Sequence, residues 1–128
     1  MATGAAAAGE RVKDAMHELH AHAEQRGETL FVSLAGEFDI SNAGRLTRET
    51  APFTFGDVTG IDVDLTCLNY VDSTGLRDFV LLRHKADAAH IPLTLYVQTG
   101  STVCRMLNLL GFPELAHVVE VPQASEIL

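Results

Sequence analysis

The sequence predicts an α/β fold in which helices pack on a mixed, largely parallel sheet of four to five strands. Two observations lead to this prediction. Short segments of strand type alternate along the chain with segments whose apolar residues recur at helical spacing. This alternation is typical of right-handed crossover units, in which each helix returns the chain to a neighbouring parallel strand. The length of 128 residues fits one domain with a core of its own.

Four segments are predicted as strands because their apolar residues alternate or run continuously: 29–36, 59–66, 93–97 and 117–121. The segment 18–28 is ambiguous, because its apolar residues fit both a helical and an alternating pattern. The turn-like sequence QRGE just before Thr29 favours a hairpin with the strand that follows. Gly36 is expected to end that strand.

Three helices are predicted, over 39–50, 73–90 and 101–111. The second is the longest, and its broad apolar face is formed by Leu76, Phe79, Val80, Leu82, Ala86 and Ala89. Candidate caps and stops are Asp39 and Ser41 for the first helix, and Ser101, Thr102 and Gly111 for the third. The last residues, 122–128, offer the start of a terminal helix.

Composition and charge exclude several functional classes for this chain. The chain has a net charge of −8 and no basic patch, which argues against nucleic acid binding. No apolar run reaches the length of a membrane span, and the first residues lack the pattern of a signal peptide. We therefore expect a cytoplasmic protein without membrane insertion, with a flexible leader over 1–16 and a single domain over 17–128. Cys67 and Cys104 fit no metal spacing and are expected to be reduced core residues, with a redox-controlled disulfide as the alternative.

The stretch YVDSTGL, residues 70–76, lies just past a predicted strand and at the first turn of the longest helix. In such sheets, functional groups gather at the carboxyl ends of the strands. Asp72 is explained as a helix cap, which contributes about 1 kcal/mol. Capping does not explain the adjacent hydroxyls of Ser73 and Thr74, or Gly75, since glycine costs about 1 kcal/mol relative to alanine in a helix. Gly75 therefore indicates either close backbone packing or room for an approaching partner.

Three signatures together resemble the STAS domain family and, within it, the bacterial anti-sigma factor antagonists. YVDSTGL is similar to the family's phosphoacceptor motif. Gly-Glu-Phe-Asp at 36–39 is similar to a Gly-Glu-x-Asp at the end of an early strand, and VCRMLNLLGF at 103–112 is similar to the family's penultimate helix. Their order and spacing match over residues 17–128. The chain departs from the family at Arg77, where a small residue is frequent, and over residues 1–16, which have no counterpart.

The resemblance implies a protein that is not an enzyme and holds no cofactor or metal. It implies an ATP-binding anti-sigma factor serine kinase as partner, in a pathway of transcription regulation and stress response. The unphosphorylated antagonist would bind this kinase, which then releases its sigma factor, and phosphorylation would end the binding. Carried onto this chain, the phosphoacceptor is Ser73, on which a phosphatase would also act. The supporting residues are Asp72, Thr74, Gly75, Glu37 and Asp39.

Helical spacing places Ser73, Arg77, Leu81 and His84 on one side of the longest helix, away from its apolar face. We expect Arg77, Leu81 and His84 to contact a partner. Leu81 is apolar among polar residues, and it is either the anchor of a contact surface or an isolated exposed leucine. Arg77 follows Ser73 by one turn, so it either binds a phosphate there or is simply solvated.

Two other functions stay open. A STAS-type accessory subunit of a membrane transporter ATPase would use Ser73 only structurally. A small α/β hydrolase would use Ser73 as a nucleophile, although the pattern Gly-x-Ser-x-Gly is absent.

Two further clusters are expected to be structural. The sequence HELHAH, residues 17–22, lacks the spacing of a zinc-binding HExxH helix. If the segment is a strand, His20 and His22 share a face, which we expect to be solvated. Asp62 and Asp64 are too few for the acidic cluster of a response-regulator receiver, and we expect them to flank a buried strand.

Overall fold

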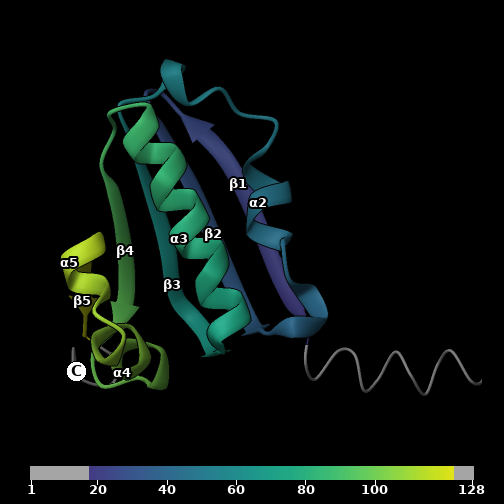
Figure 1. The fold of residues 1–128 in the computed structure, drawn as a ribbon, viewed down its shortest axis with the longest axis vertical. Coiled ribbons are helices and arrows are strands. Elements are labelled where there is room, and N and C mark those ends of the chain that lie inside the picture. Colours follow the sequence, from purple (N-terminus) through teal and green to yellow (C-terminus); the bar gives the residue numbers. More distant parts are fainter. Residues whose placement is uncertain (1–17, 123–128) are drawn as a thin grey trace, which may run out of the picture.

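The computed structural model describes residues 18–122, which form a five-stranded sheet covered by helices (Figure 1). The strands are β1 (Leu19–Arg26), β2 (Thr29–Phe38), β3 (Gly60–Val71), β4 (Leu93–Gln98) and β5 (His117–Val121). The helices are α2 (Arg45–Thr50), α3 (Ser73–Ala88), α4 (Thr102–Leu109) and α5 (Phe112–Leu115), with short 3₁₀ helices η1 (Ile40–Asn42) and η2 (Phe55–Asp57). The leader predicted over 1–16 lies outside the described range, as does all but the first residue of the helix predicted over 122–128.

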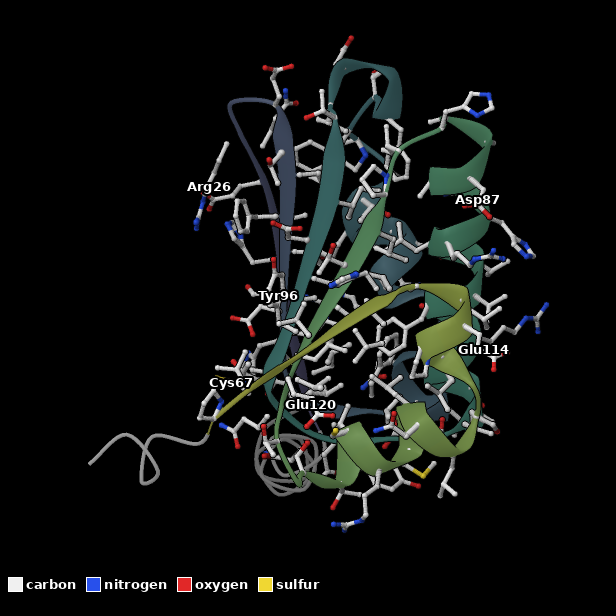
Figure 2. The ribbon with its side chains drawn as sticks, turned by 90° about the vertical axis from the view of Figure 1, so that its left-hand side faces the viewer. Arg26, Cys67, Asp87, Tyr96, Glu114 and Glu120 are labelled. Carbon is white, nitrogen blue, oxygen red and sulfur yellow. The ribbon has the colours of Figure 1, made fainter. Side chains whose placement is uncertain are left out.

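The strands cross the sheet in chain order, β1-β2-β3-β4-β5. β1 runs antiparallel to β2, and all other neighbours are parallel. Because the right-handed crossovers all lead in the same direction, the connecting helices lie on one face. Figure 1 shows α2 and α3 in front of the strands, and Figure 2, turned by 90°, shows the helices on one side of the sheet. The predicted fold class is confirmed, and the second face carries no helix from residues 18–122.

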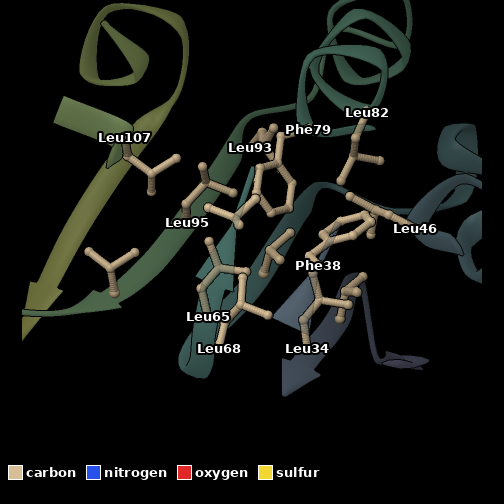
Figure 3. Close-up of a cluster of buried hydrophobic side chains, with 14 of the residues drawn as sticks. Leu34, Phe38, Leu46, Leu65, Leu68, Phe79, Leu82, Leu93, Leu95 and Leu107 are labelled. Carbon is tan, nitrogen blue, oxygen red and sulfur yellow. The ribbon is translucent and has the colours of Figure 1, made fainter. Parts of the chain in front are cut away.

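The core lies between the sheet and the helices (Figure 3). Alternate residues of the central strands point into it, including Leu30, Val32 and Leu34 of β2, Ile61, Val63 and Leu65 of β3, and Leu93, Leu95 and Val97 of β4. Phe79 of α3 makes edge-to-face ring contacts with Phe38 and Phe112, at centroid distances of 5.6 and 6.2 Å. Such pairs add about 0.5–1.5 kcal/mol to the area they bury. They hold α3 against the sheet and against α5.

β1 and β2 form the predicted hairpin, so the helical alternative for 18–28 is wrong. Arg26 pairs with Thr29 across a turn in which Gly27 has a φ of +60°. This left-handed conformation suits glycine, which has no Cβ. Leu19 is buried and Ala21 packs against the core, while His20 between them is exposed.

β2 and β3 are longer than predicted. β2 continues through Gly36 to Phe38, and β3 continues past residue 66 to Val71. The pairing of the two strands shifts register between Ser33 and Ala35 and between Gly36 and Glu37. In β3 the irregularities leave two residues between the buried Leu65 and Leu68, so a search for period two ends this strand too early. Gly36, which was expected to end β2, is instead part of the strand.

The helix predicted over 39–50 is wrong as a single element. Gly44, with a φ of +82°, separates η1 from α2. Asp39 caps η1, but neither Asp39 nor Ser41 caps α2. The segment therefore turns twice within a length that the sequence pattern assigned to one helix.

The other two predicted helices are present and slightly shorter. The Ser101 hydroxyl caps α4 by accepting a hydrogen bond from the N–H of Cys104 at 3.0 Å. Gly111, with a φ of +75°, follows α4 and leads directly into α5, which the sequence did not predict. None of the helices within residues 18–122 is both long and apolar enough to cross a membrane.

Candidate functional site at the start of helix α3

The stretch YVDSTGL forms a junction where β3 passes almost directly into α3. β3 ends at Val71 and α3 begins at Ser73, so Asp72 alone separates them. The Asp72 carboxylate accepts hydrogen bonds from the N–H groups of Thr74 and Gly75, at 2.9 and 3.0 Å. Asp72 is thus the N-cap of α3, as expected, and it fixes the direction in which the helix leaves the sheet.

Ser73 occupies the first position of α3 and is exposed. Its hydroxyl makes no hydrogen bond with any residue of the described range 18–122. Thr74 is half-buried. Of the two adjacent hydroxyls, Ser73 is therefore the more accessible to another protein.

Gly75 is required because the helix packs closely on the ends of the strands. A Cβ at this position would lie 2.8 Å from the Phe38 carbonyl oxygen and 2.9 Å from a side-chain carbon of Val71. Contacts this short do not occur between real side chains. Of the two explanations offered by the sequence for Gly75, the structure supports close backbone packing.

The second signature, at 36–39, borders this junction. Gly36 has a φ of +99°, and a Cβ there would lie 2.1 Å from the Glu18 carbonyl oxygen. Glycine is therefore needed where β2 passes the start of β1. Two residues later, the Phe38 carbonyl accepts a hydrogen bond from the Asp72 N–H at 3.1 Å, which ties the end of β2 to the cap of α3.

Asp39 holds the loop beside the junction rather than pointing to Ser73. Its carboxylate accepts hydrogen bonds from the N–H and the hydroxyl of Ser41, at 2.9 and 2.6 Å. Asn42 completes the loop: its side-chain oxygen accepts from the Asp39 N–H at 3.0 Å, and its amide donates to the Glu37 carbonyl at 2.9 Å. Asp39 therefore supports the junction by fixing η1, which contacts α3.

The predicted partner-contacting residues lie on the outer side of α3. Arg77, Leu81 and His84 are exposed, and 38% of Leu81 is accessible. Arg77 and His84 make no hydrogen bond or ion pair with other residues between 18 and 122. Ile40 of η1, an element that contacts α3, is 75% exposed. We call the exposed side of α3 formed by Ser73, Arg77, Leu81 and His84 the α3 surface.

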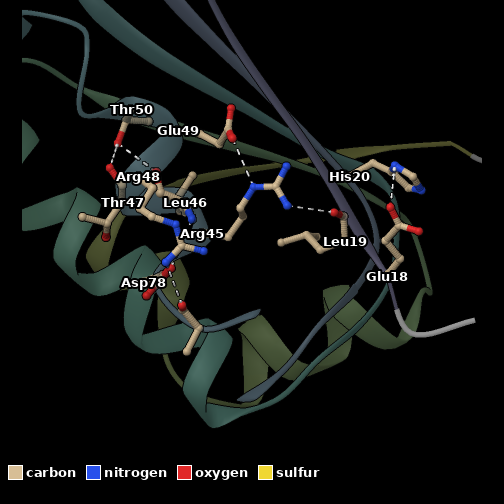
Figure 4. A network of polar contacts seen from close by, with 11 residues as sticks. Glu18, Leu19, His20, Arg45, Leu46, Thr47, Arg48, Glu49, Thr50 and Asp78 are labelled. Atoms are coloured by element: carbon tan, nitrogen blue, oxygen red, sulfur yellow. Dashed lines mark hydrogen bonds and ion pairs between the residues drawn. The ribbon is translucent and has the colours of Figure 1, made fainter. Parts of the chain in front are cut away.

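Asp78 is a residue of this region that sequence reasoning missed. It lies on the buried side of α3 with 4% exposure, and its carboxylate accepts a hydrogen bond from the Leu46 N–H at 3.2 Å (Figure 4). Asp78 thereby caps α2 from a different helix, which replaces the cap that Gly44 cannot supply. Burial raises the pKa of Asp78, although hydrogen bonds from α2 oppose the shift. A sequence signal existed, because residue 78 falls at helical spacing among the apolar residues of α3.

Within residues 18–122, the remaining candidate side chains are not gathered into a metal-binding group. His20 and His22 share one face of β1 and are exposed, and residues 18–122 contain no group of three ligand side chains that could hold a metal ion. Cys104 is buried, whereas Cys67 is exposed, so the prediction that both cysteines are core residues is wrong for Cys67. The reason is the irregularity in β3, which leaves two residues between the buried Leu65 and Leu68 and turns Cys67 outward.

The fold and the junction together define a small α/β domain with a free serine at the start of its longest helix. The family model of the STAS domain matches residues 20–123, which is most of the chain. The protein therefore belongs to the STAS domain family. No curated protein sequence matches the chain significantly.

Solved structures with the same architecture include antagonists of anti-sigma factors. The crystal structure of an anti-sigma factor antagonist from Mycobacterium paratuberculosis has a TM-score of 0.70 and 17% identity, covering 86% of this chain and 91% of that one. The anti-sigma factor antagonist SpoIIAA in its unphosphorylated form has a TM-score of 0.60 and 20% identity, covering 84% and 94%. The Bacillus cell fate determinant SpoIIAA in its phosphorylated form has a TM-score of 0.53 and 18% identity, covering 84% and 96%. At these identities, the similarity concerns the fold.

Proposed function

We propose that the protein is an anti-sigma factor antagonist that is switched by phosphorylation of Ser73. The observation that carries the proposal is the exposed, unbonded hydroxyl of Ser73 in the strand–helix junction that resembles the family's phosphoacceptor motif. The similarity of the fold to that of antagonists, one of them solved in a phosphorylated form, lends further support. The unphosphorylated chain binds an ATP-binding anti-sigma factor kinase in the cytoplasm, and the kinase then releases its sigma factor.

Electrostatics explains why a phosphate on Ser73 would end the binding. The phosphate adds about −1.5 to −2 charges at pH 7. It would stand beside the Asp72 carboxylate, which already uses the N–H groups of Thr74 and Gly75. Next to a partner that holds nucleotide phosphates, this charge is repelled and must lose its water. A loss of about 3 kcal/mol weakens binding more than a hundredfold.

The α3 surface has the composition of a contact surface. Leu81 supplies an exposed apolar group on the same side of α3 as the serine, and Arg77 and His84 supply polar groups without partners among residues 18–122. Interfaces combine such apolar anchors with a polar rim. We therefore assign the kinase contact to this surface.

Under this proposal, the chain is a substrate and binding partner of the kinase and has no catalytic activity of its own. A serine nucleophile requires a neighbouring base that removes its proton. Within the described residues, no histidine is hydrogen-bonded to Ser73. This favours the antagonist over the hydrolase, and a separate phosphatase would remove the phosphate.

The test is incubation with an anti-sigma factor kinase and ATP, followed by intact mass and peptide mapping. We expect one phosphate on the wild type and on Thr74→Ala, and none on Ser73→Ala. Ser73→Ala should keep its affinity for the kinase, and Ser73→Glu should bind at least tenfold more weakly, because a carboxylate carries part of the phosphate charge. Phosphate transfer to Ser73→Ala would refute the assignment. Absence of both binding and transfer would favour an accessory subunit of a transporter ATPase.

A further inference from the structure

The face of the sheet opposite the helices carries a second candidate site. Parallel sheets usually have both faces covered, yet no helix from residues 18–122 lies on this face. Figure 2 shows Arg26 and Tyr96 on this side, and Asp87 and Glu114 on the side of the helices. We call the side without helices the open face.

A cavity of about 440 Å³ is formed on the open face by side chains from all five strands. This volume falls within the range of small-molecule sites, about 300–1,000 Å³. Its lining includes His22, Glu24 and Arg26 of β1, Phe31 and Ser33 of β2, Asp64 and Thr66 of β3, Tyr96 of β4 and Val121 of β5. The cavity therefore combines aromatic rings with a few polar groups, as ligand sites do.

The charged side chains that β1 contributes to the cavity already contact one another. The Glu24 carboxylate accepts one hydrogen bond from Arg26 at 2.5 Å and makes another with His22 at 2.8 Å. These hydrogen bonds, chiefly the one from Arg26, lower the pKa of Glu24. The Arg26 guanidinium also lies 4.5 Å from the centre of the Phe31 ring. Arg26 is therefore occupied and is poorly placed to bind an added anion.

The centre of the cavity, by contrast, has hydrogen-bonding capacity that is not used. Ser33, Asp64 and Tyr96 lie side by side in register on β2, β3 and β4. One Asp64 oxygen accepts from the N–H and the hydroxyl of Thr66, at 2.9 and 2.6 Å. The second Asp64 oxygen and the hydroxyls of Ser33 and Tyr96 make no hydrogen bond within residues 18–122.

The neighbouring register position adds further negative charge. Asp62 lies next to Phe31 and is half-buried, and its carboxylate has no partner within residues 18–122. With Glu24 neutralised by Arg26, the carboxylates of Asp62 and Asp64 give the centre of the open face a net negative charge. An aromatic ring flanks this pair on each neighbouring strand: Phe31 on β2 and Tyr96 on β4.

We propose that this cavity binds a small organic cation with a flat apolar body, of the aryl amidinium or guanidinium kind. Its N–H groups would donate to the free oxygen of Asp64 and to Ser33, and its body would lie against Tyr96. Aromatic faces attract cations, and carboxylates bind planar N–H pairs with charge-assisted hydrogen bonds. The site lies on the opposite face of the sheet from α3, so it is separate from the proposed function of Ser73.

The proposal can be tested by titrating the full chain with three probes of the same size, followed by ¹⁵N–¹H correlation spectra. Benzamidine is a cation, benzamide is neutral and benzoate is an anion. We expect saturable shifts for benzamidine that are centred on the amides around Ser33, Asp64 and Tyr96. Benzamide and benzoate should bind at least tenfold more weakly, because they lack the charge that Asp62 and Asp64 attract.

Variants locate the site. Asp64→Asn and Tyr96→Leu should each weaken benzamidine binding about tenfold. Asp87→Asn is the matched control, since it removes the same charge from the helix side, and it should leave the affinity unchanged. Three results would overturn the proposal: benzoate binding as tightly as benzamidine, no saturable shift at millimolar probe, or an affinity for benzamidine in Asp64→Asn and Tyr96→Leu that equals the affinity of the wild type. The signals of the variants away from the cavity report whether each variant is folded.

Discussion

Gly75 shows how the absence of a side chain positions the serine two residues before it. Alanine is the better helix former by about 1 kcal/mol, but its Cβ would meet the Phe38 carbonyl oxygen at 2.8 Å. Overpacking of this kind costs about 1–3 kcal/mol, and backbone cannot move aside as a flexible side chain can. We therefore expect Gly75→Ala to lower the free energy of unfolding by up to about 2 kcal/mol net. Urea unfolding measures this, with Gly56→Ala as control, because a Cβ there meets nothing within 4 Å.

Asp78 makes the free energy of unfolding depend on pH, and the direction of its pKa shift fixes the sign of this dependence. Burial raises the pKa of its carboxyl in the folded state. Between the unfolded and the folded pKa, the folded protein holds more protons, so stability falls as the pH rises through this window and is constant above it. In Asp78→Asn, this contribution disappears. We expect the unfolding free energy of the wild type minus that of Asp78→Asn to decrease from pH 3 towards neutral pH. A difference that increases over this range would contradict the assignment.

The sequence predicted the chemistry of single residues unevenly. Asp72 and Ser73 were predictable because a cap and a helix entry are read from neighbouring residues. Asp78 was not, because its partner Leu46 lies 32 positions away and its role exists only after α2 and α3 have packed. Cys67 was assigned to the core for a related reason: its orientation depends on a register irregularity between two strands.

At the scale of elements, the start of α3 is where charge would be added. A phosphate on Ser73 would meet the Asp72 carboxylate, and Arg77, one turn later, is the cation that can reach it. We expect phosphorylation to change the unfolding free energy more favourably in the wild type than in Arg77→Gln, by about 0.5–1 kcal/mol. Lys85→Gln, which removes a charge three turns from Ser73, is the control and should behave as the wild type does.

The measurement is thermal and urea unfolding of phosphorylated and unmodified forms of each variant, which together form a double-mutant cycle. An identical response to phosphorylation in all three proteins would mean that Arg77 is simply solvated.

Element boundaries were harder to predict than element types. The sequence indicated four of the strands and the two longer helices, because apolar periodicity extends over whole elements. For 18–28 the periodicity fitted both a helix and a strand, and only the turn-like QRGE favoured the hairpin. It failed at 39–50, where Gly44 with its positive φ divides the segment, at the end of β2, which continues through Gly36, and at the end of β3, where irregularities disturb the period. These three mispredicted segments lie close to the junction between β3 and α3. The extra residues lengthen β3, the central strand, whose carboxyl end leads into Ser73. The irregularities that the sequence did not reveal therefore lie next to the candidate site.

On the scale of the whole molecule, chain-order strands and right-handed crossovers divide the surface into two faces with different roles. The helix side carries the α3 surface and the proposed partner contact. The open face carries the cavity with Asp64 and Tyr96. Fold class follows from the sequence pattern, but this division does not, because it requires the strand order.

The division predicts that partner binding depends on one side of α3 alone. Leu81 is 38% exposed at the middle of the α3 surface, and apolar anchors of an interface typically contribute about 1–2 kcal/mol or more. Leu81→Ser should weaken kinase binding about tenfold, while its unfolding free energy stays within about 0.5 kcal/mol of the wild type.

Leu115→Ser is the matched control, because Leu115 is 36% exposed. The Leu115 carbonyl accepts a hydrogen bond at 2.6 Å from Arg83. Arg83 lies about 200° round α3 from Leu81, so Leu115 is on a different side of the helix. Affinity measured by calorimetry should fall for Leu81→Ser only; an equal loss in both variants, or in neither, would remove Leu81 from the contact and leave it an isolated exposed leucine.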